Sequence, residues 1–207
     1  MEQEPIFELS GGALCLDFAN TWGDRGRPET DKLRGYSDLL AFALQAGLLT
    51  AGDEARLARR AEREPREAAA ALALARDLRE ALYGIFSAAA AGSGPEAADL
   101  ERLNAALPKA LSHLRLERQG MELVWGWATP DDPLESPLWP VLRAAADLLT
   151  SEERRQVREC AANACTWLFL DHSRNRSRRW CSMETCGNRA KAQRHYRRRT
   201  DEDSGIQ

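Results

Sequence analysis

Residues 160–189 read CAANACTWLFLDHSRNRSRRWCSMETCGNR, and the cysteines of this stretch decide how the C-terminal part of the chain folds. Four residues separate Cys160 from Cys165, fifteen separate Cys165 from Cys181, and four separate Cys181 from Cys186. Two short loops of equal length can each supply two thiolates to one tetrahedral ion, the sulfur-only arrangement that zinc prefers in structural sites. Loops of two residues are commoner than loops of four, so the spacing is a good sign without being decisive. It predicts one structural Zn²⁺ held by these four cysteines.

Disulfide bonds are the main alternative use of these cysteines. We expect a cytoplasmic protein without a membrane partner, because the chain has no run of about 18 apolar residues and its N-terminus lacks the features of a signal peptide. A cytoplasmic compartment disfavours disulfides. His172 and His195 are also conceivable ligands, but four cysteines already complete a tetrahedral site. We expect neither histidine to bind the metal.

The residues between and after the cysteines predict a small ββα-like unit. Residues 167–171 have the composition of a short strand, residues 173–177 of a turn, and residues 178–182 of a returning strand. Cys186-Gly187-Asn188 then opens a helix through about residue 199, with glycine for the tight turn and Asn188 as the cap. Nearby Arg189 could offset the net negative charge of a zinc ion with four thiolates.

Charge is distributed unevenly along the chain. Residues 174–199 hold ten Lys/Arg and one acidic residue, whereas residues 1–173 hold nineteen Lys/Arg and twenty-eight Asp/Glu. Such asymmetry indicates a nucleic-acid-binding end, since guanidinium groups grip phosphates and can read guanine edges. A solvated charge run is the plain alternative. The candidate nucleic-acid-binding residues are Arg174, Arg176, Arg178, Arg179, Arg189, Lys191, Arg194, Arg197 and Arg198.

Two aromatic residues of the basic segment, Trp180 and Tyr196, could stack on bases. We expect each of them to fill the small core of the zinc unit instead.

The rest of the chain predicts a mainly helical domain. Alanine and arginine are abundant, and aromatic and β-branched residues are few. Apolar periodicity and capping residues predict several helices. They cover residues 36–46, a segment that begins after Thr50, residues 65–91, residues 95 to about 107, and residues 136–149. A further short helix is expected after the capping residues Thr150 and Glu153. Alternating apolar residues on either side of Gln119-Gly120 predict a β-hairpin.

Polar residues interrupt the apolar stretch LCLDFANTW (14–22). Asp17, Asn20 and Thr21 either line a pocket for a small effector or form caps and buried hydrogen bonds, because polar groups that are buried must be satisfied. We favour the structural role. Cys15 lies between two leucines and is expected to be a buried apolar residue. No catalytic constellation stands out, so we expect no enzyme.

The C-terminal motifs resemble a known family. The pieces FLD, SRN, RRWCSM and CGNRAK are similar to the CGNR zinc finger over about residues 158–199. That family is named for the tetrapeptide found here at Cys186-Gly187-Asn188-Arg189. LCLDFANTW (14–22) and residues 137–160 resemble the ABATE domain that usually precedes that finger. The resemblance implies bound zinc, a mainly helical N-terminal domain, and a stress-induced transcription regulator.

Together these observations predict two domains, residues 1–155 and residues 156–207. The first would sense an effector or form a homodimer, and the second would bind DNA. A protein-interaction adaptor and an RNA-binding protein are the alternatives, because the basic segment alone does not identify its anionic partner.

Overall fold

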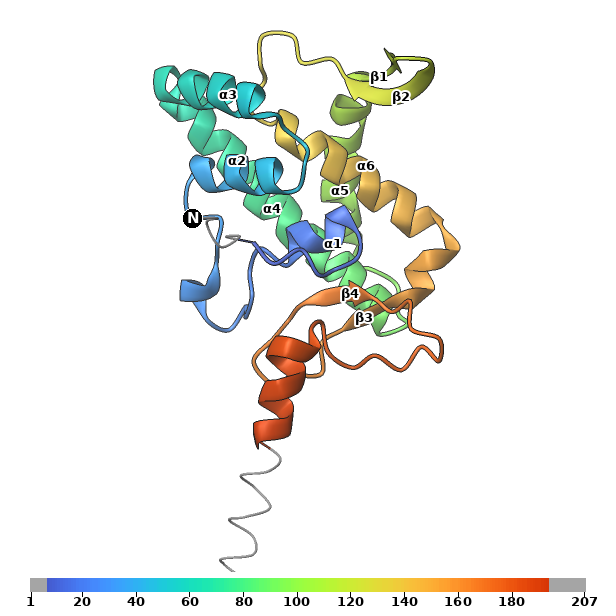
Figure 1. Cartoon of the computed structure of the whole chain (residues 1–207). Helices are drawn as coiled ribbons and strands as arrows, with labels where there is room; N and C mark the ends of the chain where they lie inside the picture. The colour runs from blue at the N-terminus through green and yellow to red at the C-terminus, as the bar shows by residue number, and fades with distance from the viewer. Residues whose placement is uncertain (1–6, 194–207) are drawn as a thin grey trace, which may run out of the picture.

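The computed structural model describes residues 7–193. Six helices make up its body, and Figure 1 shows α4 running through the middle of them. The helices are α1 (Leu14–Ala19), α2 (Tyr36–Gln45), α3 (Ala51–Arg63), α4 (Pro65–Ala90), α5 (Ala97–Ser112) and α6 (Trp139–Thr150). Helix α4 packs against α1, α2, α3 and α5 and is therefore the central helix of the body. The predicted mainly helical fold is confirmed, and no helix in the described part of the chain has the length and apolarity needed to cross a membrane.

Helices α2, α3 and α4 occur where the apolar periodicity predicts them. Helix α2 ends before Gly47, which adopts a φ of 71° that favours glycine. Thr50 caps α3 through its hydroxyl, which accepts a hydrogen bond from the Asp53 amide, while the Asp53 carboxylate accepts one from the Thr50 amide. On α4, buried alanines lead into the buried Leu78, Leu82 and Phe86, so small residues allow close approach at one end and large ones fill the core at the other.

Two predicted helix boundaries differ from the structure. Helix α5 begins at Ala97 and continues through Pro108 to Ser112, because Leu103 and Ala110 are both buried and hold the two halves in one line. Thr150 does not cap a following helix. Its hydroxyl donates instead to the Ala146 carbonyl at the end of α6, and Ser151 caps the short 3₁₀ helix Glu152–Gln156.

The predicted hairpin is confirmed as β1 (Leu114–Gln119) paired antiparallel with β2 (Glu122–Trp127), with Gly120 in the turn at a φ of 65°. At its base the neighbouring ring of His113 stacks on buried Trp139 at a centroid distance of 4.0 Å. Its distal apolar residues face solvent, with Leu116 58%, Leu123 69% and Trp125 55% exposed. The alternating apolar residues therefore predicted the two strands correctly. Only the base of the hairpin packs against the core.

A second antiparallel pair, β3 (Val157–Glu159) and β4 (Leu168–Leu170), connects the body to the cysteines. Successive side chains of a strand point to opposite faces. Accordingly, Leu168 and Leu170 belong to the main core, whereas Phe169 packs with the cysteines in a separate cluster. Figure 1 shows this pair beneath α1 and the C-terminal end of α4. The β3–β4 sheet therefore separates the main hydrophobic core from the cluster around the cysteines.

Candidate metal centre

The four predicted ligands meet in space. All of their sulfur atoms lie within 4.8 Å of one another, and the Sγ atoms of Cys181 lie 3.7 Å from Cys165 and 3.6 Å from Cys186. A tetrahedral zinc ion with Zn–S bonds of about 2.3 Å requires sulfur atoms about 3.8 Å apart. The cluster therefore has the dimensions and the sulfur-only chemistry of a closed structural zinc site, which confirms the predicted cofactor Zn²⁺.

Each pair of cysteines is positioned by a different local structure. Cys160 follows β3, and its amide donates to the Trp167 carbonyl at 2.9 Å, so the loop to Cys165 closes across the β3–β4 ladder. Cys181 follows an irregular segment, and its amide points at the Cys160 sulfur at 3.4 Å. Cys186 lies in a single π-helical turn, Met183–Gly187, that leads into the helix of residues 188–193.

The sulfur atoms compete for protons. Hydrogen bonds from Cys165 and Cys181 lower the pKa of Cys160 well below its ordinary value, whereas the hydrogen bond with Cys160 raises the pKa of Cys165. The contact with Cys160 likewise raises the pKa of Cys181 far above its ordinary value. Several thiolates this close together repel one another, and a divalent cation at their centre removes that repulsion.

The segment between the cysteine pairs differs from the predicted ββ arrangement. Residues 178–182 form no strand, and β4 pairs with β3 instead. The reason lies in buried Asp171, whose carboxylate accepts hydrogen bonds from the Ser173 and Arg178 amides and so ties residues 171–178 into a loop. The helix cap also differs. Ser182 is the N-cap, and Asn188 lies inside the helix with its amide group donating to the Glu184 carbonyl.

Arg178 is part of this loop. Its guanidinium lies 4.4 Å from the Phe169 ring centre and donates to the carbonyls of Trp180 and Cys181. These contacts place the charge of Arg178 over the Phe169 ring and bind the guanidinium to the backbone at Trp180 and Cys181. Trp180 itself is partly buried against the cysteine cluster, as predicted for a core residue.

The other described basic residues of the segment are exposed, and none forms an ion pair with a described carboxylate. They are Arg174, Arg176, Arg179, Arg189 and Lys191. Arg179 and Arg189 line a cavity of about 280 Å³ together with Asn163 and Gln193. Three further candidates, Arg194, Arg197 and Arg198, lie outside the described residues, as do His195 and Tyr196. His172 is exposed and lies 3.7 Å from Glu153, away from the cysteines.

Of the polar residues near the N-terminus, Asn20 connects the helical body to β4. The amide group of Asn20 donates to the Leu168 carbonyl and accepts from the Leu168 amide, both at 2.8 Å and both buried. Thr21 donates to the Phe18 carbonyl at 2.8 Å, and Asp17 accepts from the Gly11 amide at 2.7 Å. Burial raises the pKa of Asp17 to about 6. These contacts give all three candidate effector residues a partner within the chain.

The sequence analysis did not single out two arginines that link the N-terminal segment to α4, one of which, Arg25, also reaches Thr166 beside Cys165. The guanidinium of Arg79, only 1% exposed, makes hydrogen bonds of 2.6 and 2.9 Å to the two carboxylate oxygens of Asp31. Arg25 pairs with Glu80 at 2.8 Å, lies 3.5 Å from the Tyr83 ring centre and donates to Thr166 beside Cys165 at 3.1 Å. The sequence does contain a signal for Arg79, because this arginine lies on the apolar face of α4, three residues before Leu82.

Comparison with known families gives two matches. The ABATE model, described as "Putative stress-induced transcription regulator", matches residues 12–152. The CGNR zinc finger model matches residues 156–199, which include all four cysteines. Both are regulator and zinc-finger types of domain, and neither is an enzyme family. No curated protein matches the chain.

Proposed function

Because the chain belongs to the ABATE family and carries a CGNR zinc finger after that domain, we propose that it is a transcription regulator whose finger binds duplex DNA. The observation that supports this most directly is the exposed basic surface of the finger. We define it as Arg174, Arg176, Arg179, Arg189 and Lys191. Their charges face solvent without carboxylate partners among the described residues, on a module that a zinc ion would hold rigid.

Phosphate is the natural partner of this surface. Each cation that neutralises a DNA phosphate releases a counterion, so binding weakens steeply as salt increases. Arg179 and Arg189 flank one cavity, where two planar guanidinium groups can hold a phosphate from two sides. Asn163 and Gln193 line the same cavity and carry amide groups of the kind that read adenine edges. This cavity is our candidate for the centre of the DNA contact.

Arg178 serves the finger differently from its neighbours. Its cation–π contact with Phe169 and its bonds to two backbone carbonyls fix the approach to Cys181. We therefore propose Arg178 as a support of the metal site and assign DNA contacts to the exposed residues around it.

The test is binding of the full-length zinc-loaded protein to a fluorescent duplex of mixed sequence, measured by fluorescence anisotropy across a salt series. Five phosphate contacts predict a log–log salt slope of about −4 to −5. The double variant Arg179→Ala/Arg189→Ala should bind more weakly, with a slope reduced in magnitude by about 2. Its zinc content, measured by elemental analysis, should stay at one per chain.

The matched control is Arg115→Ala/Arg118→Ala, which removes two exposed arginines from β1. Figure 1 shows this hairpin at the end of the molecule opposite the finger, so this variant should bind as the parent does. Equal loss in the two double variants would contradict the assigned surface. Absence of duplex binding at low salt would contradict the proposed function, with tight binding to single-stranded RNA then favouring an RNA-binding protein.

A further inference from the structure

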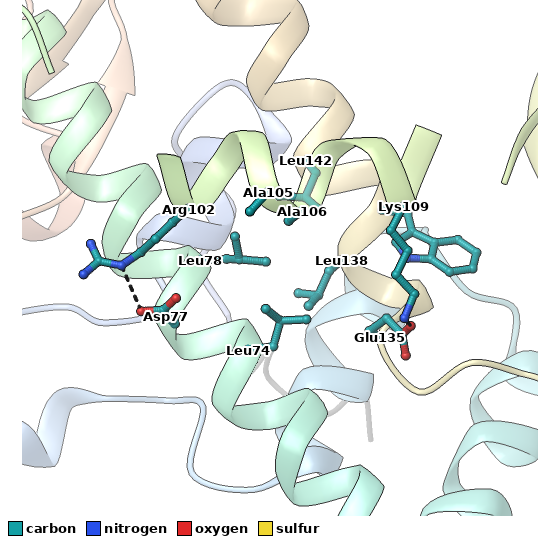
Figure 2. Close-up of a pocket in the computed structure, with 11 residues that line it drawn as sticks. Leu74, Asp77, Leu78, Arg102, Ala105, Ala106, Lys109, Glu135, Leu138 and Leu142 are labelled. Atoms are coloured by element: carbon teal, nitrogen blue, oxygen red, sulfur yellow. Dashed lines mark ion pairs between the residues drawn. The ribbon is translucent and has the colours of Figure 1, made fainter. Parts of the chain in front are cut away.

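A cavity of about 320 Å³ lies in the helical body, between α4, α5 and α6 (Figure 2). Its walls come from all three helices and from the short turn before α6. The apolar residues that line it are Leu74, Leu78, Ala105, Ala106, Leu138, Trp139 and Leu142. None of the polar residues Asp17, Asn20 and Thr21 lines this cavity.

The cavity exists because α5 presents small side chains where its neighbours present large ones. Ala105 and Ala106 face the space between Leu78 of α4 and Leu142 of α6 (Figure 2). Leu78, Leu138 and Leu142 are at most 3% exposed, so the floor of the cavity is part of the rigid core. A floor of packed leucines cannot collapse onto the alanines without moving a helix. The space is therefore built into the fold.

Among the described residues, the charged groups that line the cavity lie at its two ends and form ion pairs. At one end Arg102 lies 3.4 Å from Asp77 and 2.8 Å from Asp99. At the other end Lys109 pairs with Glu135 (Figure 2 labels both residues). A charged ligand would have to displace one of these ion pairs and would also lose its hydration against the leucine side chains. An uncharged ligand can bind without breaking either ion pair and without that desolvation cost.

We infer that this cavity binds an uncharged, mainly apolar small molecule of about a dozen non-hydrogen atoms. The size follows by proportion, because an apolar cavity of about 150 Å³ accommodates benzene, which has about half that number of atoms. The lining fits the general pattern of ligand pockets, in which apolar walls provide affinity and a few polar groups at the mouth fix orientation. A bicyclic aromatic alcohol has this shape and polarity. The inference stands independently of DNA binding.

The test uses 2-naphthol as the probe and 2-naphthoate as its charged counterpart, each titrated into the full-length zinc-loaded protein by isothermal titration calorimetry. We expect 2-naphthol to bind with a Kd below about 1 mM, and 2-naphthoate to bind at least about tenfold more weakly. Two variants reduce the cavity from different walls, Ala105→Phe on α5 and Leu74→Trp on α4. Each should weaken 2-naphthol binding at least tenfold.

The control is Ala98→Phe, which adds the same side chain to an exposed position of α5 outside the cavity. It should leave 2-naphthol binding unchanged, which would show that the effect of Ala105→Phe depends on the position of the added ring. Thermal unfolding of each variant checks that it is folded. No binding to the parent protein, or binding that both cavity variants retain, would overturn the site. Tighter binding of 2-naphthoate would overturn the uncharged class of ligand.

Discussion

Replacing Asn20 with alanine tests whether the finger and the helical body are one folding unit. The substitution removes the amide group that pairs with both backbone polar groups of Leu168, at 2.8 Å each. Leu168 is fully buried, so neither group can turn to water. Each orphaned group costs about 1–3 kcal/mol, which predicts a loss of about 2–6 kcal/mol. That is a large part of the roughly 5–15 kcal/mol by which a domain is stable.

The measurement is urea unfolding followed by far-ultraviolet circular dichroism, with zinc release followed in the same samples by a chelating dye. We expect Asn20→Ala to move both transitions to lower urea together, because β4 carries Leu168 on one face and Phe169 on the other. Asn175→Ala, in an exposed loop of the finger, is the matched control and should change stability by less than about 0.5 kcal/mol. A loss no greater than the control's, or zinc release in a separate transition, would refute the reasoning.

Three further predictions concern the metal, the buried ion pair and pH. Cys181→Ser should abolish stoichiometric zinc by elemental analysis and lower the unfolding midpoint of the whole chain, since structural zinc contributes on the order of 10 kcal/mol and β3–β4 shares the main core. Arg79→Leu should cost about 3–5 kcal/mol in urea unfolding by leaving the Asp31 carboxylate without its buried partner, while Arg34→Leu, an exposed change nearby, should cost less than about 1 kcal/mol. Burial raises the pKa of Asp17 to about 6, so stability from this group is fully present below about pH 4 and is lost as pH rises through about 6. Asp17→Asn should therefore be more stable than the parent by roughly 1–2 kcal/mol near neutral pH and equal to it near pH 4, and parallel thermal-unfolding profiles across this range would contradict that.

Local patterns predicted the parts of this fold that depend on neighbours in sequence. The capping residues Thr50 and Asp53, the turn at Gly120 and the spacing of the four cysteines each act within a few residues of chain or through one metal ion. Such features can be deduced because the geometry of a cap, a turn or a tetrahedral site admits few residue types.

The features that the sequence did not reveal depend on contacts between distant residues. Asn20 and Leu168 are 148 positions apart, and nothing near either residue specifies the other. The segment 178–182 has strand-like composition, but Asp171 ties down its first residues and β3 already occupies the neighbouring position to β4. Helix α5 passes through Pro108 because buried residues on both sides of it outweigh one lost hydrogen bond. Tertiary packing decided these three cases.

Helix α4 joins the apolar cavity to the finger. It lines the cavity with Leu74 and Leu78, and over the next turns its Tyr83 contacts Arg25 and its Ser87 donates to Glu159 of β3. A packed helix moves as a rigid element, so a displacement at the cavity also displaces the residues that hold the finger. Because Arg25 reaches Thr166 beside Cys165, such a displacement acts on the segment that leads directly from one metal ligand into β4. A ligand that changed how α4 packs against α5 would therefore also act on the contacts that hold the finger, and we propose this as the route from the cavity to the proposed DNA contact.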